Sequence, residues 1–173
     1  MSAPSSISRT ESWFTTAVLM LAFSALPGCV SSAAHQGVPD DFSLDVAIVP
    51  EAGSTNTEAT RHFVLHADGS LQAGRGRQGA ANSYPGLARQ LSATQMVELL
   101  NLARQALATA PADRPALPSQ WRHEKPLQEG FTLLLWVRDS GVESATRLDA
   151  VNGSLPTAAE RLRTRLHELA LMR

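Results

Sequence analysis

The chain has 173 residues, of which 43% are hydrophobic and 18% charged, and its formal net charge is −1. This composition is typical of a globular protein and excludes disorder throughout the chain. The balanced charge indicates no nucleic acid as a partner. The single cysteine excludes an internal disulfide. We therefore expect a fold that rests on its apolar core.

An apolar stretch, Trp13–Leu26, follows a polar segment whose side-chain cation is Arg9. A membrane-spanning helix needs ~20 predominantly apolar residues, so this shorter stretch instead fits the hydrophobic region of an export signal. The stretch runs into Leu26-Pro27-Gly28-Cys29. Pro27 and Gly28 disfavour a helix, and we expect an extended, cleavable backbone there.

This tetrapeptide resembles the lipobox of bacterial lipoproteins, with an aliphatic residue three positions before the cysteine and a small residue directly before it. In that family the thiol receives diacylglycerol, the leader is removed and the new amino terminus is acylated. The resemblance implies cleavage between Gly28 and Cys29 and attachment of acyl chains such as palmitate at Cys29. Two alternatives remain, namely ordinary secretion with cleavage near 32–34 and an uncleaved anchor.

The lipobox resemblance also implies an exported protein, anchored in the cell envelope through lipid on Cys29. Val30 follows the cysteine, and by resemblance to known sorting rules this favours the periplasmic side of the outer membrane in a Gram-negative cell. We therefore divide the chain into a signal peptide at 1–28, a lipidated cysteine and tether at 29–40, and one α+β domain at 41–173. The tether is short, small and polar.

The domain opens with strand patterns. Phe42–Val49 alternates apolar and polar residues, which predicts a half-buried strand ended by Pro50. A second strand is predicted at Arg61–Ala67 and a returning strand at Leu71–Gly74. Asp68-Gly69 between them predicts a two-residue hairpin turn, because such turns require the positive φ that glycine accepts.

A helix is predicted next. Ser92 and Gln95 form a capping-box pattern. The apolar residues that follow recur at helical spacing: Met96, Leu99, Leu100, Ala103 and Leu107. From Ala108 to Gly130 the chain contains four prolines, which predicts an exposed connection without regular structure. Loops of this length in compact domains are either functional or mobile.

The last part of the chain predicts a hairpin and a second helix. Phe131–Arg138 is apolar on one face and partly apolar on the other, which indicates a central strand, and 139–141 turns it into a polar edge strand at Val142–Asp149. Thr157-Ala-Ala-Glu160 is a second capping-box pattern. The stripe of the helix that it opens consists of Ala159, Leu162, Leu166 and Leu169. We therefore expect an antiparallel sheet of four to five strands with two helices on one face, in the order β-β-β-α-β-β-α.

The segment Gly74–Gly79 matches the letters of a dinucleotide-binding motif, GxGxxG. That motif must open a helix, whose N-terminus holds the pyrophosphate, and no helix is predicted here. Arg75 and Arg77 are instead candidates for contact with an anionic partner, such as a lipid phosphate or a cell-wall carboxylate. The alternative is a solvated loop.

His62 and His66 have the spacing of a helical metal site, but they fall on a predicted strand, where ~13 Å separates them. We expect both to be exposed. No metal site, cofactor or catalytic residue is predicted, and the GxSxG nucleophile motif is absent from the sequence. Trp121 lies in the Pro-rich connection, where it either anchors a partner or folds back to cover the edge of the sheet.

The C-terminal half of the chain resembles the emfourins, a family of small bacterial protease inhibitors, through the residues Leu99–Ala103, Phe131–Val137 and Leu155–Leu169. The resemblance implies a helix, a connection, a strand, a hairpin and a closing helix, and inhibition of an exported protease. Our leading hypothesis is a non-enzymatic envelope lipoprotein that binds a protein or cell-wall partner. Protease inhibition and an enzyme with a site of dispersed residues are the alternatives.

Overall fold

The computed structural model describes residues 37–55, 60–75, 85–110, 118, 121 and 124–171. The predicted signal peptide at 1–28 and the lipobox cysteine Cys29 lie outside this range. The described strands are β1 (Ser43–Pro50), β2 (Thr60–Leu65), β3 (Ser70–Arg75), β4 (Gly86–Gln90), β5 (Phe131–Asp139) and β6 (Val142–Ala150). The α-helices are α1 (Ala93–Ala108) and α2 (Thr157–Leu171), and a short 3₁₀ helix covers Val151–Gly153.

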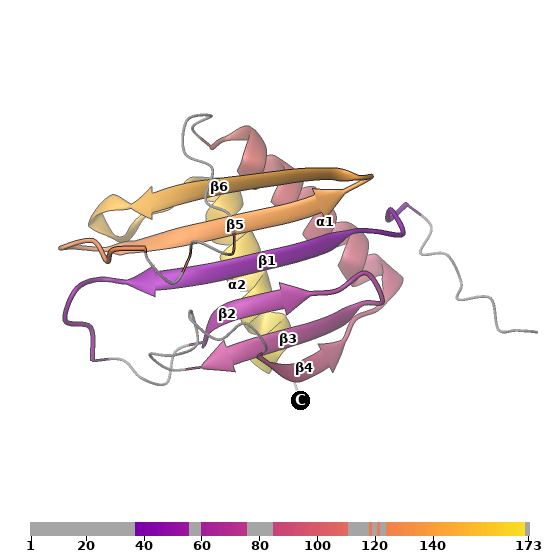
Figure 1. Cartoon of the computed structure of the whole chain (residues 1–173), viewed down its shortest axis with the longest axis horizontal. Coiled ribbons are helices and arrows are strands. Elements are labelled where there is room, and N and C mark those ends of the chain that lie inside the picture. The colour runs from indigo at the N-terminus through magenta and orange to yellow at the C-terminus, as the bar shows by residue number, and fades with distance from the viewer. Residues whose placement is uncertain are drawn as a thin grey trace, which may run out of the picture. The chain divides into compact units, whose positions relative to one another are not determined.

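The described strands form one antiparallel sheet in the order β4-β3-β2-β1-β5-β6. Both helices lie behind this sheet in Figure 1 and cover one of its faces. The predicted α+β class is confirmed. The predicted number of four to five strands is wrong, because the described sheet has six, and the order contains one more strand before the first helix.

The strand that the sequence did not predict is β4. Its side chains are exposed or only half buried, and the large apolar residue Leu87 is 68% exposed. It pairs with β3 through a shifted register between Leu71 and Gln72. Because β4 buries no apolar face, it carries no alternating pattern, and backbone pairing at the sheet edge stabilises it instead.

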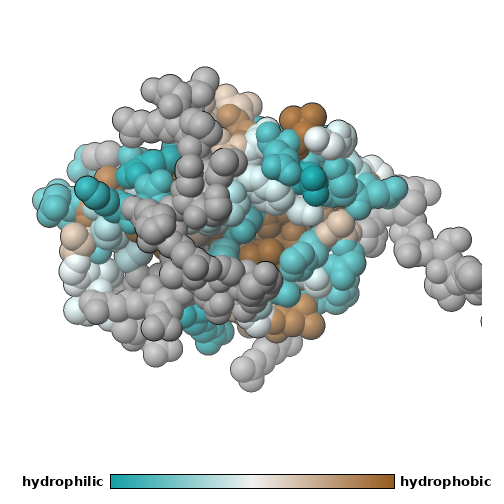
Figure 2. All heavy atoms as spheres, in the orientation of Figure 1, coloured by the Kyte–Doolittle hydropathy of each residue, from teal (hydrophilic) through white to brown (hydrophobic). Residues whose placement is uncertain are grey.

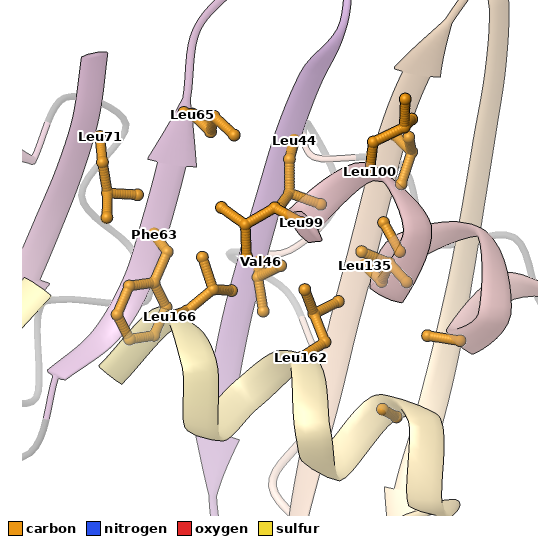
Figure 3. Close-up of a cluster of buried hydrophobic side chains, with 14 of the residues drawn as sticks. Leu44, Val46, Phe63, Leu65, Leu71, Leu99, Leu100, Leu135, Leu162 and Leu166 are labelled. Carbon is orange, nitrogen blue, oxygen red and sulfur yellow. The ribbon is translucent and has the colours of Figure 1, made fainter. Parts of the chain in front are cut away.

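The core lies between the sheet and the helices. β1 and β5 pair over eight residues, and their alternate side chains Leu44, Val46, Leu133 and Leu135 point toward the helices. Figure 3 shows these strands meeting the leucines of both helices. The predicted stripe of the second helix is confirmed, since all four of its residues are buried. In α1 the stripe is confirmed with one difference, because Ala106 is buried and Leu107 is only half buried.

Two hairpin turns set the register of the β5–β6 and β2–β3 pairs. The β5–β6 turn consists of Ser140 (φ 53°) and Gly141 (φ 78°), a pair of positive φ angles that matches the twist of the strands. The β2–β3 hairpin differs from the predicted two-residue turn. The His66 carbonyl accepts from the Gly69 N–H (2.9 Å), and the His66 N–H donates to the Ser70 carbonyl (3.0 Å). The loop therefore has three residues and ends on Gly69 with φ 83°.

The first predicted helix cap is confirmed and the second is wrong. The Gln95 N–H donates to Ser92 Oγ (3.3 Å), and the Ser92 N–H donates to Gln95 Oε1 (2.9 Å). In α2, Thr157 lies inside the helix, because the Glu160 N–H donates to the Pro156 carbonyl. The Glu160 carboxylate instead pairs with Arg163. The proline before Thr157 occupies the place that a capping side chain would need.

We predict opposite effects for the same substitution at two buried threonines on neighbouring strands. Thr146 Oγ1 is a buried hydroxyl without a partner among the described residues, whereas Thr132 Oγ1 donates to Asp149 (2.8 Å). Thr146→Val should raise the free energy of unfolding by about 1 kcal/mol, and Thr132→Val should lower it by about 1–2 kcal/mol. Urea denaturation of both variants measures the two changes. A loss of stability in Thr146→Val would contradict the assignment.

We also predict a pH dependence of stability from His167 in α2. Its ring packs edge-to-face on Phe63, with 4.9 Å between ring centroids. Burial, reinforced by the charge of Arg163, lowers the pKa of His167 below its ordinary value of 6.5, and Glu160 opposes this shift. The unfolded chain therefore binds a proton more readily than the folded protein between the lowered and the ordinary pKa values.

The stability that neutral His167 contributes is complete above its ordinary pKa and falls as the pH drops toward the lowered value. In His167→Phe, which keeps an aromatic ring against Phe63, this component should disappear. Denaturant unfolding at pH values from about 7.5 to 5 measures it. Identical pH slopes in the two proteins would show that His167 does not titrate differently on folding.

Candidate functional site on the second sheet face

The face of the sheet away from the helices carries a second, smaller apolar cluster. Ala47 and Val49 from β1 and Leu134 from β5 form its floor, Trp121 lies on them, and Trp136 packs beside them half buried. Figure 2, which is drawn in the orientation of Figure 1, shows mostly hydrophilic side chains over the described part of this face, with small hydrophobic areas between them. The apolar cluster of this face therefore lies beneath Trp121, and most of the described side chains around it are polar.

Trp121 lies on the face of the sheet. The residue comes from the Pro-rich connection and is only 5% exposed. Of the two roles that the sequence left open, partner contact and cover of the sheet, this position fits the second. It covers a face, however, and the sequence interpretation had placed it at an edge. The described residues of the connection contain no strand or α-helix.

A buried histidine borders the Trp121 cluster. His62 is 4% exposed, and its Nε2 lies 2.7 Å from Asp45 Oδ1. The His62 ring also lies edge-on to the Trp121 indole, with 6.1 Å between ring centroids. The expectation that His62 is exposed is therefore wrong, because the Pro-rich connection returns over this face. His66, in the β2–β3 turn, is exposed as predicted.

A charged network lies on the other side of the cluster. Arg147 on β6 pairs with Asp149 through its Nε (2.9 Å) and with Glu124. Arg147 and Glu124 are each about 20% exposed, so water screens the pair only in part. Thr132 donates to the same Asp149 oxygen (2.8 Å). Glu124 belongs to the Pro-rich connection, which is thus held to the sheet by an ion pair as well as by the Trp121 indole.

Of the remaining predicted site residues, the structure describes only Arg75, which is not part of this cluster. Arg75 is the exposed last residue of β3, and Arg77 lies outside the described residues. Gly28 and Cys29, at the predicted cleavage site, also lie outside them. Gly74 and Arg75 end a strand, so the beginning of the GxGxxG segment does not open a helix. The described residues contain no group of three or more potential metal ligands.

The second face combines a covered apolar cluster with charged side chains beside it. In a protein contact surface, an apolar centre excludes water and a polar rim gives specificity. Here the chain's own Trp121 occupies the centre, with Asp45 and His62 on one side and Arg147 on the other. Within the part of the chain that the structure describes, no helix is long and apolar enough to cross a membrane.

Sequence reasoning missed both polar groups of the second face. The alternation in β1 and β2 places Asp45 and His62 on the side away from the core, but their contact depends on which residues the two strands pair. In the observed register His62 lies opposite Ala47, and Asp45 lies opposite Val64. Arg147 and Glu124 are separated by 23 residues, including a hairpin, so no local pattern marks their contact.

Comparisons with known proteins add no relative. The chain matches no protein-family model, no curated protein and no solved structure. The resemblance to the emfourins stays a prediction.

We predict that Trp121 stabilises the fold more than the other tryptophan on the same face. Trp121→Ala should lower the free energy of unfolding by about 3 kcal/mol, because it empties the site above Ala47, Val49 and Leu134. Trp136→Ala is the matched control, and its cost should be smaller because Trp136 is only half buried. Urea denaturation measures both. An equal or larger loss in Trp136→Ala would contradict the account.

Proposed function

We propose that the protein is a lipid-anchored protein of the bacterial cell envelope and that its α+β domain is a non-enzymatic binding module. The observation that carries the proposal is the tetrapeptide Leu26-Pro27-Gly28-Cys29 directly after the apolar stretch Trp13–Leu26. The lipobox interpretation also gives a role to the single cysteine of an exported chain. At ~0.8 kcal/mol per buried CH₂, several acyl chains hold a protein on a membrane where one chain binds marginally.

The start of the folded domain supports this organisation. Val38 packs against the main core and Phe42 is fully buried, so the domain begins within about ten residues of Cys29. The segment between them is thus a short link between anchor and domain. In a Gram-negative cell we place the anchor on the periplasmic side of the outer membrane, because Val30 and not an acidic residue follows the cysteine.

The binding role is supported by the second face. Trp121 already covers the apolar centre of this face, so a protein or cell-wall partner would meet the charged groups around it, and the pairs His62–Asp45 and Arg147–Glu124 are already arranged without one. Protease inhibition, the alternative from the emfourin resemblance, is a special case of protein binding. Incubation of the purified protein with exported proteases tests it, and inhibition at micromolar concentration would replace the general role with this specific one.

We predict that Cys29 is required for membrane attachment. Cells that make the protein and are fed labelled palmitate should yield a labelled band in the membrane fraction, and Cys29→Ser should yield an unlabelled precursor that keeps residues 1–28. Ser31→Ala, a change of similar size two residues away, is the control and should leave the labelling unchanged. A wild-type protein that incorporates no palmitate would contradict the proposed lipid anchor.

The partner hypothesis has a separate test. Cross-linking in intact membranes, followed by affinity purification of the tagged chain, should enrich a protein or a cell-wall fragment, and the Cys29→Ser variant should enrich less of it. The Cys29→Ser variant shows whether capture of the partner depends on membrane attachment, because the described domain does not include the substituted residue. Intact wild-type protein that repeatedly returns no partner would contradict the binding role.

A further inference from the structure

The topology places the start of the domain and three of its other features at one end of the sheet. β1 begins there at Ser43, the β2–β3 loop and the β5–β6 turn lie there, and α1 begins there, since the Leu91 N–H donates to the Gly69 carbonyl (2.9 Å). We call this the Ser43 end, and it lies at the right of Figure 1. The opposite Pro50 end holds the start of β5 and the end of β6.

The chain is fixed where it reaches the Ser43 end. The Asp41 carboxylate accepts from the backbone N–H groups of Ser140 (3.0 Å) and Gly141 (2.6 Å), which joins the incoming chain to the β5–β6 turn. The Phe42 N–H donates to the Pro39 carbonyl (3.0 Å), and the Phe42 side chain is buried. The direction in which the domain receives its link is therefore set by the fold.

We propose that the domain presents its Ser43 end to the bilayer and its Pro50 end away from it. This inference rests on the proposed lipid attachment at Cys29. From Cys29 to Gly37 the chain spans at most ~29 Å, at ~3.6 Å for each of the eight steps. The seven steps of β1 from Ser43 to Pro50 cover ~23 Å.

The two lengths favour this orientation through the conformational freedom of the link. The Pro50 end can reach the bilayer only if the link runs back along the domain at most of its full extension, and such an extended link loses nearly all its conformational freedom. With the Ser43 end toward the bilayer, the link can connect Cys29 to the domain at any length below its maximum. The surface offered to a partner in the envelope is then the Pro50 end together with the second face.

Attraction between the Ser43 end and anionic headgroups does not set this orientation. Asp40, Asp41, Asp68 and Asp139 lie at the Ser43 end. Hydrogen bonds from Ser70 lower the pKa of Asp68, and the pair with Arg104 lowers the pKa of Asp139, so both carboxylates are charged at neutral pH. Arg104 and Arg138 lie at the same end, so its charges balance in part, and the covalent link rather than the charge of the headgroups holds this end close to the membrane.

Energy transfer between the domain and a bilayer tests the orientation. The chain from Cys29, which contains every described residue, is coupled through its single thiol to a maleimide lipid in phosphatidylcholine vesicles that carry acceptor dye on their headgroups. A donor is placed by a non-natural residue either at Val142, which is 63% exposed beside the β5–β6 turn, or at exposed Ala52 just beyond β1. Circular dichroism confirms that each labelled protein is folded.

We expect the rate of transfer from position 142 to exceed that from position 52 about threefold or more, because the length of the sheet separates the two donors. The same order is expected when phosphatidylglycerol is added. As a control, the lipid is moved to the other end with Cys29→Ser and Ala52→Cys, and transfer from position 142 should fall. Equal rates, or a higher rate from position 52, would overturn the orientation.

The chemical coupling makes this test independent of lipid attachment in the cell. If palmitate labelling fails but the vesicle experiment gives the expected order, the anchor is wrong and the geometry of the domain stands. If labelling succeeds and the order is not found, the protein is anchored but its orientation is not the one proposed.

Discussion

The structure depends on the pairing of β1 with β5. These two strands are interior strands of the described sheet, and they join the first half of the chain to the C-terminal hairpin across some eighty residues. Eight consecutive pairs, from Ser43 with Arg138 to Pro50 with Phe131, fix one register. A shift of one strand by a single residue would turn all of its side chains to the opposite faces, so the register has a strong energetic preference.

Both faces of the molecule follow from that register. On one face Val46 lies opposite Leu135 and contributes to the core beneath the helices. On the other face Ala47 lies opposite Leu134, and this pair forms the floor on which Trp121 packs. The same backbone hydrogen bonds therefore position the surface on which α1 and α2 pack and the floor on which the Pro-rich connection packs. Trp121 is the described residue of the connection that covers this floor.

Much of this fold is predictable from local patterns. The alternation in β1 and β5, the capping box at Ser92 and the stripe of α2 each place apolar groups on one side of an element, and the structure has these elements close to the predicted positions. The strand β4 was not predictable in this way, because its stability comes from pairing with β3 and not from burial. The β2–β3 loop has one residue more than predicted, because Gly69 alone, rather than the Asp68-Gly69 pair, supplies the positive φ.

The candidate site was less predictable than the fold. Lipid attachment is a prediction from four residues, and these lie outside the described part of the chain. The burial of His62 and the ion pair of Arg147 with Glu124 arise from contacts between segments distant in sequence, and propensity carries no information about such contacts. The sequence identified Trp121 as a residue of interest, and the structure shows what its indole covers.

The claim that organises the proposed function is that Cys29 is the first residue of the mature protein and carries lipid. Mass spectrometry of the N-terminal peptide, released from protein purified from the membranes of cells that make it, tests this claim most directly. The account predicts a peptide that begins at Cys29 and is heavier than its sequence by a diacylglyceryl group and an acyl chain. An unmodified Cys29, or a mature chain that begins elsewhere, would contradict it.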